Sequence, residues 1–211
     1  MDAEKNQALM SKYAAPACQK GAKKHTSGYK LQICVQSVTN IAMKIGVLSD
    51  THGWFDPAIF AHFESCDEVW HAGDIGEALP LETFDRFNRF RAVYGNIDGR
   101  IIRSKYPDFQ SFVCEGLSIW MVHIGGNPPL YTPEIRIKLR QEIPDIFVCG
   151  HSHILRVMYD AKHATLLYLN PGAAGKQGLH HMRTLLRFEL KDQKIKGMEV
   201  IELGPRGSVH P

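Results

Sequence analysis

From residue 43 onward, short apolar runs alternate with segments whose apolar residues recur at helical spacing. The apolar runs predict strands at residues 45–48, 68–71 and 92–94, and the amphipathic segments predict helices at residues 58–63 and 79–90. Strands that alternate with helices are typical of parallel strands joined by crossover helices. The first half of this region is therefore predicted to be α/β.

The second half is richer in strands. Glu115-Gly116 lies between two apolar runs, at residues 109–114 and 117–122, and predicts a hairpin turn. A helix is predicted at residues 132–142, with Pro133 in its first turn. Further strands are predicted at residues 146–149, 156–159, 165–169, 184–190 and 195–201, with a turn at residues 191–193 between the last two.

Residues 1–42 differ in composition from the rest, which we interpret as a single domain over residues 43–211. The segment is rich in Lys, Ala, Ser and Gln, and a flexible extension is the favoured interpretation. Translation from a start codon upstream of the natural one is an alternative, because Met43 would open the first strand. A targeting peptide is disfavoured, because no arginine precedes Arg86.

Composition narrows the class of protein. The chain has 211 residues, 44% of them hydrophobic, which suits one substantial core. The formal net charge of +3 comes from the first 43 residues, where six lysines face only Asp2 and Glu4, so no specific nucleic-acid binding is expected. Five cysteines without a C-x-x-C pair indicate reduced thiols, and residues 31–43 are too polar to span a bilayer. We expect a cytoplasmic protein without a membrane partner.

Five polar motifs each follow a predicted strand directly. Because ligand sites of open α/β sheets lie beyond the carboxyl ends of the strands, these motifs should gather at one edge. Two carboxylates, one amide and four imidazoles form a donor set that suits Mn, Fe, Zn, Ni or Co. The candidate metal ligands are Asp50, His52, Asp74, Asn96, His123, His151 and His153.

Each motif alone is weak evidence, because a lone histidine is usually structural or solvated. We place in that class His25, His62, His163, His180, His181 and His210. Gly150-His151-Ser152-His153 is the strongest single motif, and the ordered combination of all five is the real signal.

In the order D-x-H, G-D, G-N, H and G-H-x-H, these motifs resemble the calcineurin-like metallophosphoesterase superfamily. Over residues 43–203 the chain looks most like its small YfcE-type phosphodiesterases, a branch whose fold the retromer subunit Vps29 shares. The resemblance implies a four-layer α/β/β/α sandwich of two mixed sheets. It also implies hydrolysis of a phosphate ester by a hydroxide shared between two divalent metals, with Mn first and Ni, Fe, Zn, Co or Mg as alternatives.

The resemblance also implies roles for individual residues. Asp50, His52 and His153 would hold the first metal. Asn96, His123 and His151 would hold the second, and Asp74 would bridge both. Asp74, Asn96 and His123 are the expected catalytic residues.

Three positions depart from the family pattern. Ile124 and Ala173 replace a usual glycine and a frequent serine, and Ile97 stands where larger members carry a histidine that acts as general acid. Leaving-group protonation is therefore unassigned, and Asp98 and His71 are candidates for positions just behind the ligands. Esters with good leaving groups should depend least on such an acid.

Three functions compete. A metal-dependent phosphodiesterase acting on a small phosphorylated substrate is favoured. A Vps29-like binding scaffold and a monophosphatase of the wider superfamily are the alternatives, and homo-oligomerisation stays open. Residues 125–131 and 173–181 are expected to form the rim of the site, where Lys176, His180 and His181 are better interpreted as a solvated loop than as phosphate contacts.

Overall fold

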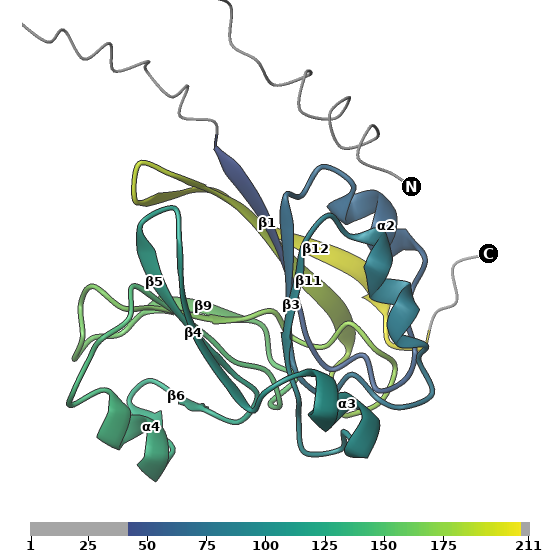
Figure 1. Ribbon diagram of the computed structural model, residues 1–211, viewed down its shortest axis with the longest axis horizontal. Helices are drawn as coiled ribbons and strands as arrows, with labels where there is room; N and C mark the ends of the chain where they lie inside the picture. The colour runs from purple at the N-terminus through teal and green to yellow at the C-terminus, as the bar shows by residue number, and fades with distance from the viewer. Residues whose placement is uncertain (1–41, 208–211) are drawn as a thin grey trace, which may run out of the picture. The chain divides into compact units, whose positions relative to one another are not determined.

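The computed structural model describes residues 42–207, and these residues form two five-stranded mixed sheets and a two-stranded ladder (Figure 1). The extension predicted at the start of the chain lies outside the described residues, apart from its last residue. Within residues 42–207, no helix is long and apolar enough to cross a membrane.

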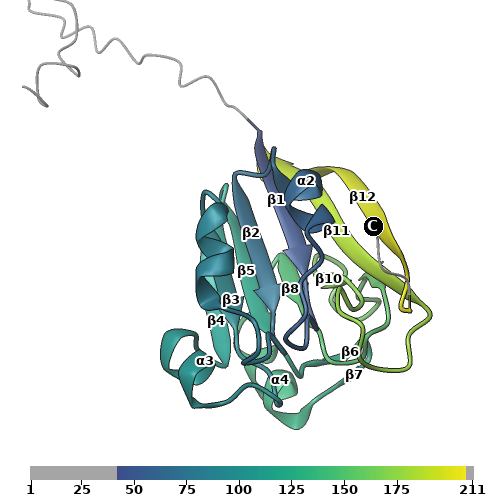
Figure 2. The same ribbon diagram turned by 90° about the vertical axis from the view of Figure 1, so that its right-hand side faces the viewer.

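The first sheet has the strand order β12-β11-β1-β2-β3. Strands β1, β2 and β3, which run from the centre of the sheet to one edge, are parallel, as predicted. Strand β11 runs antiparallel to β1 on its other side. Figure 2 shows β1 and β2 running in the same direction, so that their carboxyl ends meet at one end of the sheet. The strands are β1 (Met43–Leu48), β2 (Glu68–Ala72), β3 (Phe90–Val93), β11 (Met182–Lys191) and β12 (Lys194–Pro205).

The second sheet has the order β4-β5-β8-β10-β9, with β5, β8 and β10 parallel. The predicted β4–β5 hairpin is confirmed, and Glu115 and Gly116 take positive φ angles of 49° and 77° in its turn. The strands are β4 (Phe109–Cys114), β5 (Leu117–Val122), β8 (Ile146–Val148), β9 (Arg156–Tyr159) and β10 (Leu167–Asn170), and the separate ladder is β6 (Gly126–Asn127) with β7 (Leu130–Tyr131).

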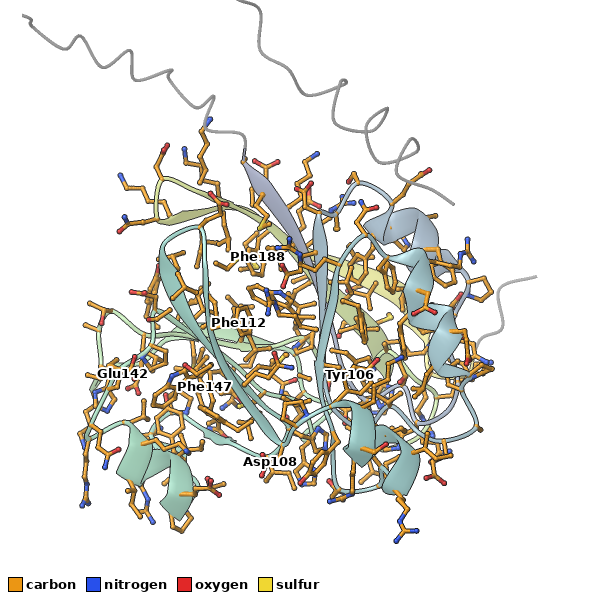
Figure 3. All side chains as sticks on the ribbon, in the orientation of Figure 1. Tyr106, Asp108, Phe112, Glu142, Phe147 and Phe188 are labelled. Carbon is orange, nitrogen blue, oxygen red and sulfur yellow. The ribbon has the colours of Figure 1, made fainter. Side chains whose placement is uncertain are left out.

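The main core lies between the two sheets. Alternate residues of β1, β2, β5, β8 and β10 face inward and are almost fully buried. Trp70 of β2 packs edge-on against Phe112 of β4 at 5.4 Å and Phe188 of β11 at 5.9 Å, and Figure 3 shows the two phenylalanines between the sheets. Burial of each such ring stabilises the fold by about 2 kcal/mol.

Short helices cover the outer faces and complete the predicted four layers. Ile59 and Phe63 of α2 (Ala58–Phe63) pack on the outer side of the first sheet. Ile135 and Leu139, in and just after α4 (Pro133–Lys138), pack with Phe147 on the outer side of the second sheet. The predicted fold class is confirmed.

The predicted helix at residues 79–90 is wrong. The structure has a 3-10 helix, η2 (Leu81–Arg86), and Phe90 already begins β3. Leu81, Phe84 and Phe87 recur at intervals of three, which matches the three residues per turn of a 3-10 helix better than an α-helix. Phe84 then stacks on Phe90, with 4.3 Å between the ring centroids.

Two further helices differ from expectation. The helix predicted at residues 132–142 is shorter: Thr132 caps it, Pro133 is its first residue as predicted, and turns replace it after Lys138. Helix α3 (Arg100–Lys105) was not predicted, because Ile102 is its only buried residue and no apolar repeat marks it.

Candidate metal centre

Loops that follow β1, β2, β3, β5 and β8 meet at the carboxyl ends of the strands. The first two loops continue the pairing of their strands: the Asp50 N–H donates to the Gly73 carbonyl at 3.0 Å, and the His52 N–H donates to the Asp74 carbonyl at 2.9 Å. The structure thus brings together side chains that lie up to about a hundred residues apart in the sequence.

A first group contains Asp50, His52 and His153, whose ligand atoms lie within 4.8 Å of one another. The Nε2 atoms of the two histidines are 3.1 Å apart, and Asp50 Oδ1 lies 3.1 Å from His153 Nε2. Asp50 Oδ1 is fully buried and yet has no hydrogen bond. Three donor atoms that converge in this way fit a cation between them.

A second group contains Asp74, His123 and His151, again with ligand atoms within 4.8 Å of one another. Asp74 Oδ2 lies 3.2 Å from His123 Nε2, and Asn96 Oδ1 lies 3.2 Å from the same nitrogen. His123 Nδ1 donates to the Ala72 carbonyl at 2.8 Å, which leaves Nε2 to act as the ligand atom.

The Asp74 carboxylate faces both groups. Its Oδ2 lies 3.7 Å from Nε2 of His52 in the first group and 3.2 Å from Nε2 of His123 in the second. The side chain is 3% exposed, so burial of its charge is costly, and a cation between the two groups would offset that cost. This position is the one that a bridging ligand requires.

Five of the seven predicted ligands have a left-handed backbone, with positive φ angles that only glycine adopts without strain. They are Asp50 (56°), His52 (50°), Asp74 (55°), His151 (67°) and His153 (57°). Such a conformation costs about 1 kcal/mol or more at each residue and persists only where its surroundings impose it. The strain therefore concentrates where the side chains must turn inward.

Asp98 joins two of the ligand loops. Its buried carboxylate accepts N–H groups from Ile75 at 3.2 Å, Gly76 at 2.7 Å and Gly95 at 2.7 Å. The first two follow Asp74 and the third precedes Asn96, so one carboxylate fixes two ligands relative to each other. Because its oxygens are used by the backbone, Asp98 serves to position the loops.

Asn170 plays the same part for the loop of His151 and His153. Its amide nitrogen donates to the Gly150 carbonyl at 2.8 Å and to Ser152 Oγ at 3.1 Å. Gly150 also sits so close to Asp50 that an added Cβ would lie 2.0 Å from Ser49 Oγ and 3.0 Å from Asp50 Oδ2. Close approach of two loops is therefore the reason for a glycine here.

His71 lies behind the ligands in a buried chain of hydrogen bonds. The Gly73 N–H donates to His71 Nδ1 at 3.2 Å, so Nε2 carries the proton and donates to Thr51 Oγ1 at 3.0 Å, which donates to the Ile75 carbonyl. Burial lowers the pKa of His71 to about 4, so the ring stays neutral. Like Asp98, it supports the loops from behind.

His180 lies closer to the ligands than the sequence indicates. It was expected in a solvated loop, but its ring packs edge-on against His153 at 5.3 Å and its Nε2 lies 3.1 Å from the Gly175 carbonyl. Nearby, the Lys176 ammonium lies 4.2 Å over the Trp54 ring. Residues 172–181 contain few large apolar residues and no hydrophobic periodicity, so the sequence carries no signal that could have indicated this contact.

Burial and charge set the protonation of the ligands. Burial lowers the pKa of His52, despite the nearby carboxylates of Asp74 and Asp50. Burial also lowers the pKa of His123, but its hydrogen bond to Asp74 and the charge of Asp50 outweigh that effect, so the pKa of His123 is raised. Burial likewise lowers the pKa of His151, so within the second group the raised pKa belongs to His123.

A sequence profile of the calcineurin-like phosphoesterase superfamily domain matches residues 43–193. The chain belongs to this superfamily. A phosphodiesterase of Methanocaldococcus jannaschii is 27% identical over an alignment of 146 residues that covers 62% of this chain and 83% of that protein. The resemblance inferred from the motifs is confirmed.

Solved structures show the same fold. A predicted phosphoesterase from Streptococcus pneumoniae aligns with a TM-score of 0.58 and 22% identity, over 77% of this chain and 90% of that one. Vps29 from Entamoeba histolytica in complex with Zn²⁺ aligns with a TM-score of 0.53 and 19% identity, over 76% of this chain and 99% of that one. At these identities the likeness concerns the fold.

Proposed function

We propose that this member of the superfamily is a divalent-metal-dependent phosphodiesterase. Membership in the superfamily supports hydrolysis of a phosphoester, and a phosphodiesterase is among its relatives. The observation that carries the proposal is the convergence of all seven predicted ligands in two adjoining groups, with Asp74 facing both. A degenerate site would have lost some of these donors.

The residues fit two cations. Buried Asp50 Oδ1 lacks a hydrogen bond, and the Nε2 atoms of His52 and His153 point at the same space. Asp50, His52 and His153 would hold one ion, and Asn96, His123 and His151 the other, with Asp74 between them. When bound, two divalent cations activate a shared water as hydroxide and neutralise the charge of the phosphate.

The chain itself prepares the site for this chemistry. Ala72 fixes the tautomer of His123 through its carbonyl, so Nε2 presents a lone pair. Asn96 supplies a neutral oxygen, which keeps the centre positive enough to attract a phosphate anion. Asp98 and Asn170 hold the ligand loops in place before substrate arrives.

Among the described residues, no side chain near the ligands is well placed to protonate the leaving group. The Asp98 carboxylate accepts hydrogen bonds from backbone N–H groups. His71 is buried behind Thr51, and both of its ring nitrogens already take part in hydrogen bonds. Position 97 is an isoleucine. We therefore expect the enzyme to favour esters whose leaving groups need little help from an acid.

The test is hydrolysis of bis-p-nitrophenyl phosphate by metal-stripped protein, with Mn, Ni, Mg or Zn added back singly. The mono-ester is assayed beside it, and Asp74→Ala is the control. We expect restored cleavage of the diester, faster than that of the mono-ester and lost in the variant. Folded protein that stays silent with every metal would refute the proposal.

One observation favours a second function, a Vps29-like binding scaffold. Isoleucines directly follow three of the ligands and are exposed: Ile97 is 46% exposed, Ile124 is 43% exposed and Ile154 is 59% exposed. Exposed apolar residues beside a site can dock a partner protein. Tight metal binding without any turnover of diesters would favour this alternative.

A further inference from the structure

A hollow of about 260 Å³ adjoins the second ligand group. Two of the predicted ligands, Asn96 and His123, are among the residues that line it, so an ester group bound there lies next to the second metal position. The remaining lining side chains come from the ends of β3 and β5, from the start of β4, and from α3 and α4. Those that carry the argument are Tyr94, Arg103, Asp108, Phe109, Ile124 and Glu134.

The aromatic walls of the hollow are held in place. Phe109 packs edge-on against Trp120 at 5.5 Å, and the Lys138 ammonium lies 4.5 Å from its ring centroid. The Arg103 guanidinium lies over the Tyr94 ring, 4.3 Å from its centroid. Rings fixed in this way form a hollow that exists before a ligand enters, which lowers the entropic cost of binding.

The charges in the hollow disfavour a second anion. Arg103 is its only cationic lining residue among those the structure describes, and the guanidinium already donates to the Asp98 carbonyl at 2.5 Å and the Gly95 carbonyl at 3.1 Å. Asp108 and Glu134 are exposed carboxylates, and Figure 3 shows Asp108 where β4 begins. The lining therefore offers a negatively charged arm little to pair with, whereas an uncharged arm needs no such partner.

We propose that this hollow holds one ester arm of the substrate, and that the arm is an uncharged apolar group of about the size of a single ring. The proposal rests on the phosphodiesterase function proposed above and specifies the substrate class. Drug-sized ligands fill hollows of about 300–1,000 Å³, so the smaller volume here suits one compact group. Ile124 and Phe109 supply the apolar contact, and the metal positions hold the phosphate.

Binding of inert diester analogues tests the hollow without any need for turnover. Diphenylphosphinate and dimethylphosphinate carry the same single charge and no cleavable ester bond, and they differ in the arms alone. Calorimetry with Mn-loaded protein should show at least about tenfold tighter binding of the diphenyl compound, because its ring buries apolar surface. Equal affinities, or binding of neither compound, would overturn the proposal.

Two isoleucines provide matched variants. Ile124 follows His123 and lines the hollow, whereas Ile154 follows His153 and does not line it; they are 43% and 59% exposed. Ile124→Ser should reduce the preference for diphenylphosphinate about fivefold, and Ile154→Ser should leave it unchanged. An equal loss in both variants would show that the hollow does not select the arm.

The outcomes also separate this proposal from the enzymatic one. If the protein prefers diphenylphosphinate but cleaves no diester, the hollow is supported and the phosphodiesterase function fails. If it cleaves bis-p-nitrophenyl and methyl p-nitrophenyl phosphate alike and binds the two phosphinates equally, the function stands and the hollow fails.

Discussion

The two ligand groups differ in how they meet their surroundings. In the first, Asp50 is fully buried, His52 and His153 are 11% and 14% exposed, and His180 packs against His153. In the second, Asp74 and His123 are buried, but Asn96 and His151 are exposed and the hollow opens beside them. The first group is enclosed by protein, and the second faces the space that a substrate can enter.

This difference suggests a division of labour that follows from burial alone. An enclosed group with pre-aligned donors retains its ion, whereas an open group can exchange solvent for substrate oxygens. Asp74 connects the two, because its Oδ2 faces a histidine of each group. If Asp74 couples the groups, a change at this residue should affect both metals, whereas changes elsewhere should affect one group more than the other.

The largest effect is expected for Asp74→Ala. Loss of a carboxylate that serves both groups should weaken binding of both metals and reduce diester hydrolysis by at least about 10³-fold. Metal content and turnover of the purified variant measure this. Asp192→Asn is the matched control, because Asp192 also has a positive φ angle of 53° but lies in the β11–β12 turn. Loss of only one metal would show that the groups are independent.

Asp98→Asn should act mainly on the second group. An amide offers one acceptor oxygen in place of two, so backbone N–H groups around Asp74 and Asn96 lose partners. We expect turnover to fall about 10- to 100-fold and unfolding free energy to fall by about 2 kcal/mol.

Asp145→Asn provides the comparison for that variant. The Asp145 carboxylate accepts the Ser118 N–H at 2.8 Å and its hydroxyl at 2.9 Å, before β8 and thus at the opposite end from the ligand loops. The Asp145→Asn variant should have a lower free energy of unfolding, measured in urea, and an unchanged affinity for metal. If both variants lose metal equally, the effect of Asp98 is one of general stability.

The pH dependence should distinguish the two groups. The pKa of His123 is raised, whereas the pKa values of His52 and His151 are lowered, so as pH falls a proton competes with metal first at His123, in the second group. Between pH 8 and 6, the Mn²⁺ equivalent bound at the second group should lose affinity faster than the other equivalent. Its affinity should approach a loss of about tenfold per pH unit. Asn96→Ala should abolish this more sensitive equivalent. A parallel decline of both equivalents would contradict the assignment.

The smallest effect concerns backbone strain. His151 has a φ angle of 67°, so His151→Gly should be more stable than His151→Ala by about 1 kcal/mol in metal-free protein. At His62, inside helix α2, the order should reverse, because alanine favours the helix. Urea unfolding of the four variants measures both differences. The same order at both positions would mean that strain at His151 is negligible.

Much of this arrangement could be predicted from the sequence, because the signals were local. The hairpin at Glu115-Gly116 and the place of Pro133 in the first helical turn follow from local backbone preferences. The gathering of polar motifs followed from parallel strands, whose carboxyl ends must share an edge. The structure places all seven predicted ligands at that edge.

Other features depend on contacts that no local pattern records. Phe84 stacks on Phe90 across the end of the 3-10 helix, and this contact depends on where β3 begins. His180 meets His153 only because a loop without regular structure folds back on the site. The positive φ angles of the ligands also come from loop pairing across the sheet edge, which sequence spacing cannot show.

The most direct test of the account is a titration of metal-stripped protein with Mn²⁺, in which bound metal and cleavage of bis-p-nitrophenyl phosphate are measured on the same samples. Two equivalents should bind per chain, and activity should rise with the second. Full activity after one equivalent, or two bound equivalents without any cleavage, would contradict it.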